Sequence, residues 1–214
     1  MLMKRSFMIA VALLITMCAT AQMTKEVYVG YSRVMNEYEI PLLSGNKKVG
    51  TSYGNGVEAG INLIRPITKP LALTFGLQAM YGWDDEIADY MNVRVTDQFI
   101  KFLVPVSLLC ETRPLDKDFA IEYFAGLDCS FYAYGKCKWG GKTYDWFDGK
   151  DAIGANRVQF GWHIGANLVY KRYFLTMNFQ RDFTAASGIE GRIGSFDDSS
   201  NNWANIEFRL GYRF

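Results

Sequence analysis

The sequence has almost no net charge, and this absence excludes one large class of functions. Its 23 lysine and arginine residues nearly balance 22 aspartate and glutamate residues, for a formal net charge of +1. A protein that binds nucleic acid without sequence preference needs a basic surface to neutralise the phosphates. We therefore expect no nucleic-acid partner.

Motifs for metal binding and disulfide formation are also scarce. The chain has a single histidine, His163, and no CxxC pair of the kind that is typical of zinc sites. The three cysteines beyond the N-terminal segment are an odd number, which argues against a disulfide framework. Cys129 and Cys137 could pair across a hairpin or remain single buried thiols. We expect no metal and no cofactor.

The one long apolar run lies near the N-terminus, over residues 7–17. Lys4 and Arg5 precede this run, and the small-x-small sequence Ala19-Thr20-Ala21 follows it. This order of features is typical of a secretory signal peptide, which is too short to span a membrane as a helix. We interpret residues 1–21 as a signal peptide.

The mature chain, residues 22–214, contains no run that approaches the roughly 18 consecutive apolar residues of a membrane helix. A lipid anchor on Cys18 is disfavoured, because Met17 stands where lipoprotein processing needs a small residue. An exported protein without a membrane helix is soluble, lipid-anchored or a β-barrel. The pattern of apolar residues distinguishes these classes.

Apolar residues alternate with small or polar residues along most of the mature chain. Over residues 71–81 one face is wholly apolar, and residues 204–214 place Glu207, Arg209 and Arg213 between apolar neighbours. A period of two predicts β-strands. The eight predicted strands cover residues 27–34, 54–65, 71–81, 97–110, 119–134, 157–170, 174–183 and 203–214.

The connections between these strands alternate in length. The short ones are 66–70, 111–118 and 171–173, and the long ones are 35–53, 82–96, 135–156 and 184–202. Short turns on one side and long loops on the other are typical of outer-membrane barrels, with the short turns in the periplasm.

The bulky and the small faces of the strands decide which side meets lipid. An eight-stranded barrel has an interior just wide enough for its side chains to fill. Glycines and polar residues fit that interior, so the bulky apolar residues are expected to face hydrocarbon. We predict an all-β fold, an eight-stranded antiparallel up-and-down transmembrane β-barrel. A soluble lipocalin-like barrel would invert the two faces.

Aromatic residues gather at the ends of the predicted strands, as they do at membrane–water boundaries. The loop-side group is Tyr81, Trp83, Phe131, Tyr134 and Trp203, and the turn-side group is Phe119, Tyr170, Tyr173, Tyr212 and Phe214.

Three segments carry a resemblance to a known family. FGWHIGANLVY (residues 160–170) with YFL (173–175) resembles the penultimate hairpin of the Bacteroidetes outer-membrane β-barrel proteins of the PorT-like family. FLVPVSLL (102–109) is similar to the fourth strand of that family, and Gly211-Tyr212-Arg213-Phe214 to the closing strand of outer-membrane proteins. The resemblance implies a location in the outer membrane of a Gram-negative bacterium and contact with its lipid. It also implies that the terminal aromatics are the signal read by the barrel assembly machinery.

The inward faces of the predicted strands carry charged side chains, which need partners when buried. We predict a structural polar network in the lumen made of Glu58, Lys101, Glu122, Asp128, His163, Arg181, Glu207, Arg209 and Arg213. A catalytic role for His163 would need a serine and a carboxylate on the lipid-facing surface. The sequence shows no nucleophile–base spacing around it, so we interpret it as a structural histidine.

The sequence of residues 138–142 predicts a hairpin turn, through which two neighbouring strands would extend beyond the membrane. The aromatic residues around it form a candidate contact patch for a partner or a glycan: Trp139, Tyr144, Trp146 and Phe147.

These features favour a small outer-membrane barrel with a plugged lumen and a structural or interaction role, displaying four extracellular loops. We expect no enzymatic activity, and the protein partner stays unnamed. The alternatives are an accessory subunit of a secretion machine, as the PorT-like resemblance implies, a lipid-modifying enzyme, and a pore.

Overall fold

The computed structural model describes residues 23–41, 47–88, 93–112, 118–139, 141–147, 155–183 and 201–214. The predicted signal peptide, residues 1–21, lies outside these ranges. No helix in the described part of the chain is long and apolar enough to cross a membrane.

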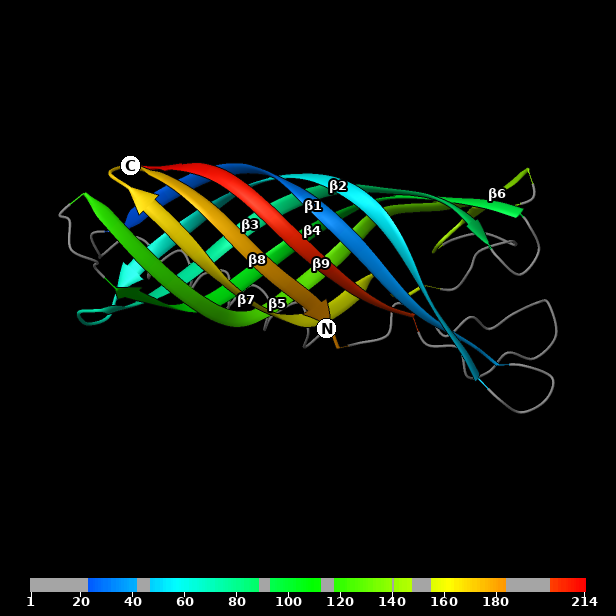
Figure 1. Ribbon diagram of the computed structural model, residues 1–214, viewed down its shortest axis with the longest axis horizontal. Coiled ribbons are helices and arrows are strands. Elements are labelled where there is room, and N and C mark those ends of the chain that lie inside the picture. Colours follow the sequence, from blue (N-terminus) through cyan, green and yellow to red (C-terminus); the bar gives the residue numbers. More distant parts are fainter. Residues whose placement is uncertain are drawn as a thin grey trace, which may run out of the picture.

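Long antiparallel strands make up most of the described chain (Figure 1). They are β1 (Thr24–Pro41), β2 (Lys47–Pro66), β3 (Leu71–Ala88), β4 (Val93–Thr112), β5 (Phe119–Trp139), β6 (Lys142–Asp145), β7 (Val158–Tyr170), β8 (Tyr173–Asp182) and β9 (Asn201–Arg213). β6 pairs with the end of β5 alone, as the predicted hairpin, and the other eight strands form the barrel.

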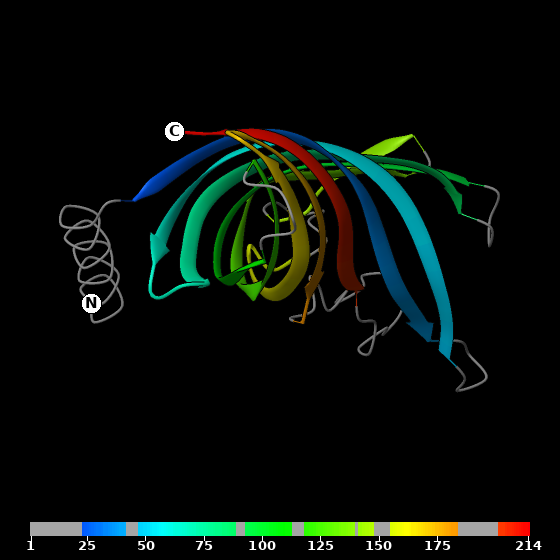
Figure 2. The same ribbon diagram turned by 60° about the vertical axis from the view of Figure 1, so that its left-hand side comes forward.

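The barrel closes because the first and last strands of the sheet order also pair with one another. The order is β4-β3-β2-β1-β9-β8-β7-β5, and β4 pairs with β5. Each of these eight strands therefore has two neighbours, and Figure 2 shows them curving around a common interior. The predicted eight-stranded antiparallel barrel is confirmed.

Short turns mark one end of the barrel. Lys171, with a positive φ of 55°, and Arg172 join β7 to β8, and residues 67–70 join β2 to β3. These turns lie at the left in Figure 1, beside the C-terminus, and β6 lies at the right. We refer to the two ends as the turn end and the loop end.

Several strands run past their predicted limits at the loop end. β1 pairs with β2 as far as Pro41 and Lys47, and β3 pairs with β4 as far as Ala88 and Val93. Most of the predicted loops over 35–53 and 82–96 is therefore strand. The sequence shows no sustained apolar–polar alternation over these extensions, so the period of two does not predict them.

A β-bulge interrupts the pairing of β4 with β5. Ile100 lies opposite Tyr134 and Lys101 lies opposite Tyr132, so Ala133 is the extra residue. The bulge changes the alternation of β5, and both Tyr132 and Gly135 are buried. Such an insertion re-aims the strand beyond it, and here it turns the β5–β6 hairpin.

The barrel is apolar outside and polar inside. Leu127 and Leu210 on the outer surface are 64% and 60% exposed, whereas Lys101 and Glu207 inside are 1% and 0% exposed. A soluble barrel would show the opposite arrangement. The predicted assignment of the two faces is confirmed, and we call the outward apolar surface the belt.

The height of the belt matches a bilayer. On β7 it runs from Val158 to Tyr170, a rise of about 40 Å along the strand, or about 30 Å at a tilt near 40°. The hydrocarbon core of a bilayer is about 30 Å thick. Polar outward residues bound the belt, with Arg65 and Lys171 at the turn end and Gln98 at the loop end. The chain therefore forms a membrane-spanning barrel.

A charge placed at the middle of the belt tests this assignment. We expect Leu127→Arg to lower the free energy of unfolding by about 2–4 kcal/mol in lipid, because the guanidinium would enter hydrocarbon. Gln98→Arg at the loop-end margin is the control, with an expected cost of about 0–1 kcal/mol. Denaturant unfolding in phosphatidylcholine vesicles measures both, and equal costs at the two positions would contradict a belt in contact with lipid.

Candidate functional site

The lumen is crossed by Arg209 of β9. Its Nε donates to Glu58 Oε1 at 2.8 Å, and its Nη2 donates to Gln78 Oε1 at 2.8 Å and also to Glu207. The guanidinium lies over the Tyr28 ring, 4.7 Å from its centroid. One cation thus links β9 to β1, β2 and β3 in the interior.

A second ionic cluster lies nearer the turn end, around Arg213. Its Nε donates to Glu26 Oε1 at 2.9 Å, and its Nη1 donates to Glu122 Oε1 at 2.8 Å. The Asn62 amide donates to Glu26 at 3.2 Å, and the Asn167 amide to Glu122 at 3.0 Å. The carboxylates are therefore held by charge-assisted hydrogen bonds, which are stronger than neutral ones.

Arg181 corrects the predicted lumen network. It lies opposite Trp162, whose side chain is on the outer surface, and its neighbour Asp182 takes the buried inward position. Adjacent residues of a strand point to opposite faces, so Arg181 shares the outward face of Phe179. The cation buried at this level is Lys101, which is 3.4 Å from Gln180 Oε1.

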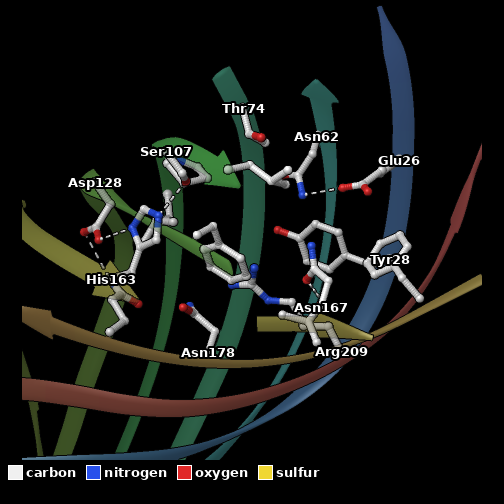
Figure 3. A pocket seen from close by; sticks show the side chains of 17 residues that line it. Glu26, Tyr28, Asn62, Thr74, Ser107, Asp128, His163, Asn167, Asn178 and Arg209 are labelled. Atoms are coloured by element: carbon white, nitrogen blue, oxygen red, sulfur yellow. Dashed lines mark hydrogen bonds and ion pairs between the residues drawn. The ribbon is translucent and has the colours of Figure 1, made fainter. Parts of the chain in front are cut away.

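His163 of β7 is the centre of a serine–histidine–aspartate arrangement. Its Nε2 lies 2.7 Å from Ser107 Oγ on β4, and its Nδ1 lies 3.2 Å from Asp128 Oδ2 on β5 (Figure 3). All three side chains are buried. The sequence shows no nucleophile–base spacing around His163, and the pairing of separate strands brings the serine and the aspartate to it.

Gly126 explains how β4 and β7 meet across the strand between them. Ser107 lies opposite Gly126, and Gly126 lies opposite His163, so the three share one row across the sheet. A Cβ at Gly126 would lie 2.7 Å from Ser107 Cα and 2.9 Å from His163 Nε2. Only glycine leaves the space in which the hydroxyl and the imidazole touch.

One hollow adjoins this arrangement, and a second lies toward the turn end. A cavity of about 30 Å³ is lined by Ser107, His163 and Asp128 together with Thr74, and it has room for about two water-sized groups. A vestibule of about 520 Å³ lies at the turn end. Leu109 lines both hollows, so its side chain is a wall that the cavity and the vestibule share.

Aromatic side chains close the lumen toward the loop end. Trp146 follows β6 and folds back so that its ring is 5.7 Å from both Phe99 and Trp203, and Phe99 lies 5.6 Å from Tyr132. All four are buried. We call these four residues the aromatic plug.

The aromatic plug corrects two predictions. Trp146 is 7% exposed and Trp203 is 4% exposed, so the first does not belong to an exposed contact patch nor the second to the outer girdle. Phe147 is half-buried beneath Arg157, whose guanidinium is 4.3 Å from its ring, and Tyr144 is half-buried on β6. The backbone of Trp139 pairs with Lys142, and its side chain lies outside the described part.

The predicted terminal aromatic residues and the cysteines complete the comparison with the sequence analysis. The rings of Tyr212 and Phe214 meet edge to face, 5.1 Å between centroids, on the outside of the turn end, and Phe214 is 67% exposed. Cys110, Cys129 and Cys137 are free thiols. Among the described residues, no group of three or more histidine, cysteine or acidic side chains is arranged to hold a metal ion.

Known proteins resemble the chain in structure and not in sequence. No protein-family model and no curated protein matches it. The attachment invasion locus protein Ail of Yersinia pestis is 11% identical, with 90% of this chain and 99% of Ail covered at a TM-score of 0.42. OprG of Pseudomonas aeruginosa is 9% identical, with 89% of this chain and 95% of OprG covered at a TM-score of 0.48. The outer-membrane protease OmpT of Escherichia coli is 9% identical, with 91% of this chain and 98% of OmpT covered at a TM-score of 0.47.

The chain's own surface gives its location. A closed barrel with an apolar belt, a polar lumen and short turns at one end is the architecture of outer-membrane β-barrels. The aromatic pairs Tyr81–Trp83 at the loop end and Phe119–Tyr170 at the turn end lie at the margins of the belt. This is an outer-membrane β-barrel protein.

Removal of the Arg209 cation tests the central ionic cluster. In Arg209→Met two buried carboxylates, Glu58 and Glu207, lose their shared cation, so we expect a loss of about 3–5 kcal/mol in the free energy of unfolding. Arg33→Met, at an exposed outer position, is the control and should cost less than about 1 kcal/mol. Denaturant unfolding in vesicles compares them, and a cost for Arg209→Met as small as the control would show that the cluster does not hold the barrel together.

A pH-dependent contribution is expected at the loop end, where Asp97 contacts the aromatic plug. Asp97 lies beyond the belt, next to exposed Gln98, and accepts hydrogen bonds from Cys137 and Trp146. Burial raises the pKa of its carboxyl to about 6, against an ordinary value of 3.8. Because its pKa is higher in the folded barrel than in the unfolded chain, Asp97 contributes to stability in its protonated form. This contribution is complete below pH 3.8 and is lost as the pH rises through about 6.

We therefore expect Asp97→Asn to stabilise the barrel by on the order of 1 kcal/mol at pH 8 and to remove this pH dependence. Denaturant midpoints at pH 4 and pH 8, measured in the same lipid for both proteins, check the expectation. A mutant that loses as much stability as the wild type between these pH values would contradict it.

Proposed function

We propose that this protein is a closed outer-membrane barrel that conducts no ions and has a structural or interaction role. The crossing of the lumen by Arg209 carries the proposal. Its guanidinium contacts Glu58, Gln78 and Glu207 in the interior, and these partners come from three strands. An eight-stranded barrel has little cross-section to spare, so this cluster and the aromatic plug leave no room for a water column.

The orientation of the barrel follows from its ends. Short turns face the periplasm in barrels of this kind, so the turn end and its vestibule lie on the periplasmic side of the membrane. The β5–β6 hairpin then stands outside the cell. Its outward residues beyond the belt include Lys136 and Lys138, which are exposed. We propose this hairpin as the part of the described chain that meets partners.

Single-channel recording tests the closed lumen. We expect the purified protein in planar bilayers to show no lasting conductance steps at 100 mV, because ions cannot pass the paired charges around Arg209 without breaking them. An open porin inserted in the same bilayers is the positive control. Sustained, reproducible conductance of the wild-type chain would overturn the proposal.

The PorT-like resemblance of residues 160–170 and 102–109 supports a second candidate, an accessory subunit of a secretion machine. A subunit of a machine should bring its neighbours along in a pulldown in mild detergent, and deletion of its gene should reduce the export of secreted cargo. Normal export in the deletion strain would remove this candidate and leave the interaction role.

A lipid-modifying enzyme acting on the surrounding bilayer is disfavoured. Such an enzyme needs its catalytic groups where an acyl chain of the membrane can reach them, and Ser107 and His163 point into the lumen (Figure 3). Unchanged lipid A in cells that lack or overproduce the protein is the expected result.

A further inference from the structure

We propose that Ser107, His163 and Asp128 form a nucleophilic site that hydrolyses small carboxylic esters entering from the turn end, with Thr74 as the hydrogen-bond donor to the oxyanion. This inference goes beyond the structural role proposed above. It also contrasts with the sequence prediction that the chain is not an enzyme.

The contacts of His163 follow the order that a serine nucleophile requires. A nucleophilic hydroxyl needs a base within about 2.6–3.2 Å, and the base needs a third group that fixes its tautomer. Ser107 Oγ and Asp128 Oδ2 meet these distances on opposite nitrogens of the same ring, at 2.7 Å and 3.2 Å. Gln180 Nε2 donates to the other Asp128 oxygen at 3.1 Å, which holds the carboxylate in place.

Thr74 supplies an independent indication of a ligand. It lies directly opposite Ser107 in the pairing of β3 with β4, and both line the cavity (Figure 3). Thr74 is 8% exposed, and its hydroxyl finds no hydrogen-bond partner within the described structure. A buried hydroxyl without a partner is costly. An oxyanion formed on Ser107 would be that partner, at the distance of a cross-strand neighbour.

The wall of the lumen between the vestibule and Ser107 selects the substrate. Ile64, Ala72 and Leu109 form a buried apolar cluster there, and Phe124 packs against it and faces the His163 ring at 6.0 Å. An acyl chain fits against this cluster, whereas the ion pair of Arg213 with Glu122 occupies another part of the vestibule. Because the cavity at Ser107 is small, the site takes a carbonyl group with a short acyl chain.

The chemistry is two acyl transfers with water as the second reactant. Ser107 Oγ bonds to the ester carbonyl carbon as its proton moves to His163 Nε2, and the oxyanion accepts a hydrogen bond from Thr74. The carbon–oxygen bond to the alcohol then breaks, and His163 returns the proton to the departing oxygen. Water attacks the acyl-serine and gives a proton to His163. The Ser107 ester breaks to release the acid, and the proton returns to Oγ.

Covalent labelling of the wild-type barrel tests the site without any variant. The folded mature chain in detergent micelles is treated with methanesulfonyl fluoride, whose sulfonyl group is close in size to the acetyl group of the test ester, and the adduct is located by peptide mass spectrometry. We expect one modified serine, Ser107, and hydrolysis of p-nitrophenyl acetate that the label abolishes. A chain that carries no adduct on Ser107 would overturn the proposal.

Four variants separate catalysis from packing. Ser107→Ala and His163→Gln should lose hydrolysis at least about 100-fold, and Thr74→Val about 100-fold in kcat with KM unchanged. Ser130→Ala, which alters another buried lumen serine, should keep full activity. The heat-dependent gel mobility of each variant reports folding. Folded Ser107→Ala that hydrolyses the ester as fast as wild type would also overturn the proposal, and neither result bears on the conductance that tests the closed lumen.

Discussion

In a closed sheet surrounded by hydrocarbon, a polar side chain that points inward can find a partner only inside the barrel. The outer surface offers no hydrogen bonds, and the strands use their own backbone groups to hold one another. The interior of an eight-stranded barrel is also narrow. Charge pairing and space are therefore the two constraints under which the lumen of this protein is built, and the remaining features follow from them.

The lumen makes room for long side chains by placing a glycine beside them. Arg209 reaches Glu58 because Gly30 lies between β2 and β9, where a Cβ would come within 2.7 Å of the Glu58 carboxylate. Gly126 makes the same allowance for Ser107 and His163. The glycines of the inward faces are thus set by what has to cross the barrel, and not by the conformation of the strands.

The period of two was sufficient to predict the strands, their faces and most of the inward charges. Glu58, Glu207 and Arg209 follow directly from alternation along a single strand. Arg181 was predicted inward, whereas the alternation of its own strand puts it on the outward face with Phe179. Trp146 lies after β6, where no alternating pattern predicts that the chain folds back into the lumen.

Contacts between side chains on different strands could not be predicted from a single sequence, because they depend on the register in which the strands pair. Ser107 and His163 are 56 residues apart, and they meet because of two successive pairings, β4 with β5 and β5 with β7. A shift of one residue in either pairing would turn one partner toward lipid. The sequence does contain one usable signal: Ser107 and Gly126 occupy small inward positions on neighbouring strands, opposite an inward histidine.

The same constraint separates a structural network from a site. A network that serves only to fill the lumen gains most when each buried group is paired, as Arg213 is with Glu26 and Glu122. Around Ser107 the pairing is unequal: His163 is bonded on both nitrogens, while the neighbouring Thr74 hydroxyl is left open to the cavity. Other buried atoms also lack a partner, Ser130 Oγ and Glu207 Oε1 among them. Thr74 differs from these because it lies directly opposite a serine that has its base, where a donor is preorganised for a charge that arises only during a reaction. The ester hydrolysis proposal explains this juxtaposition.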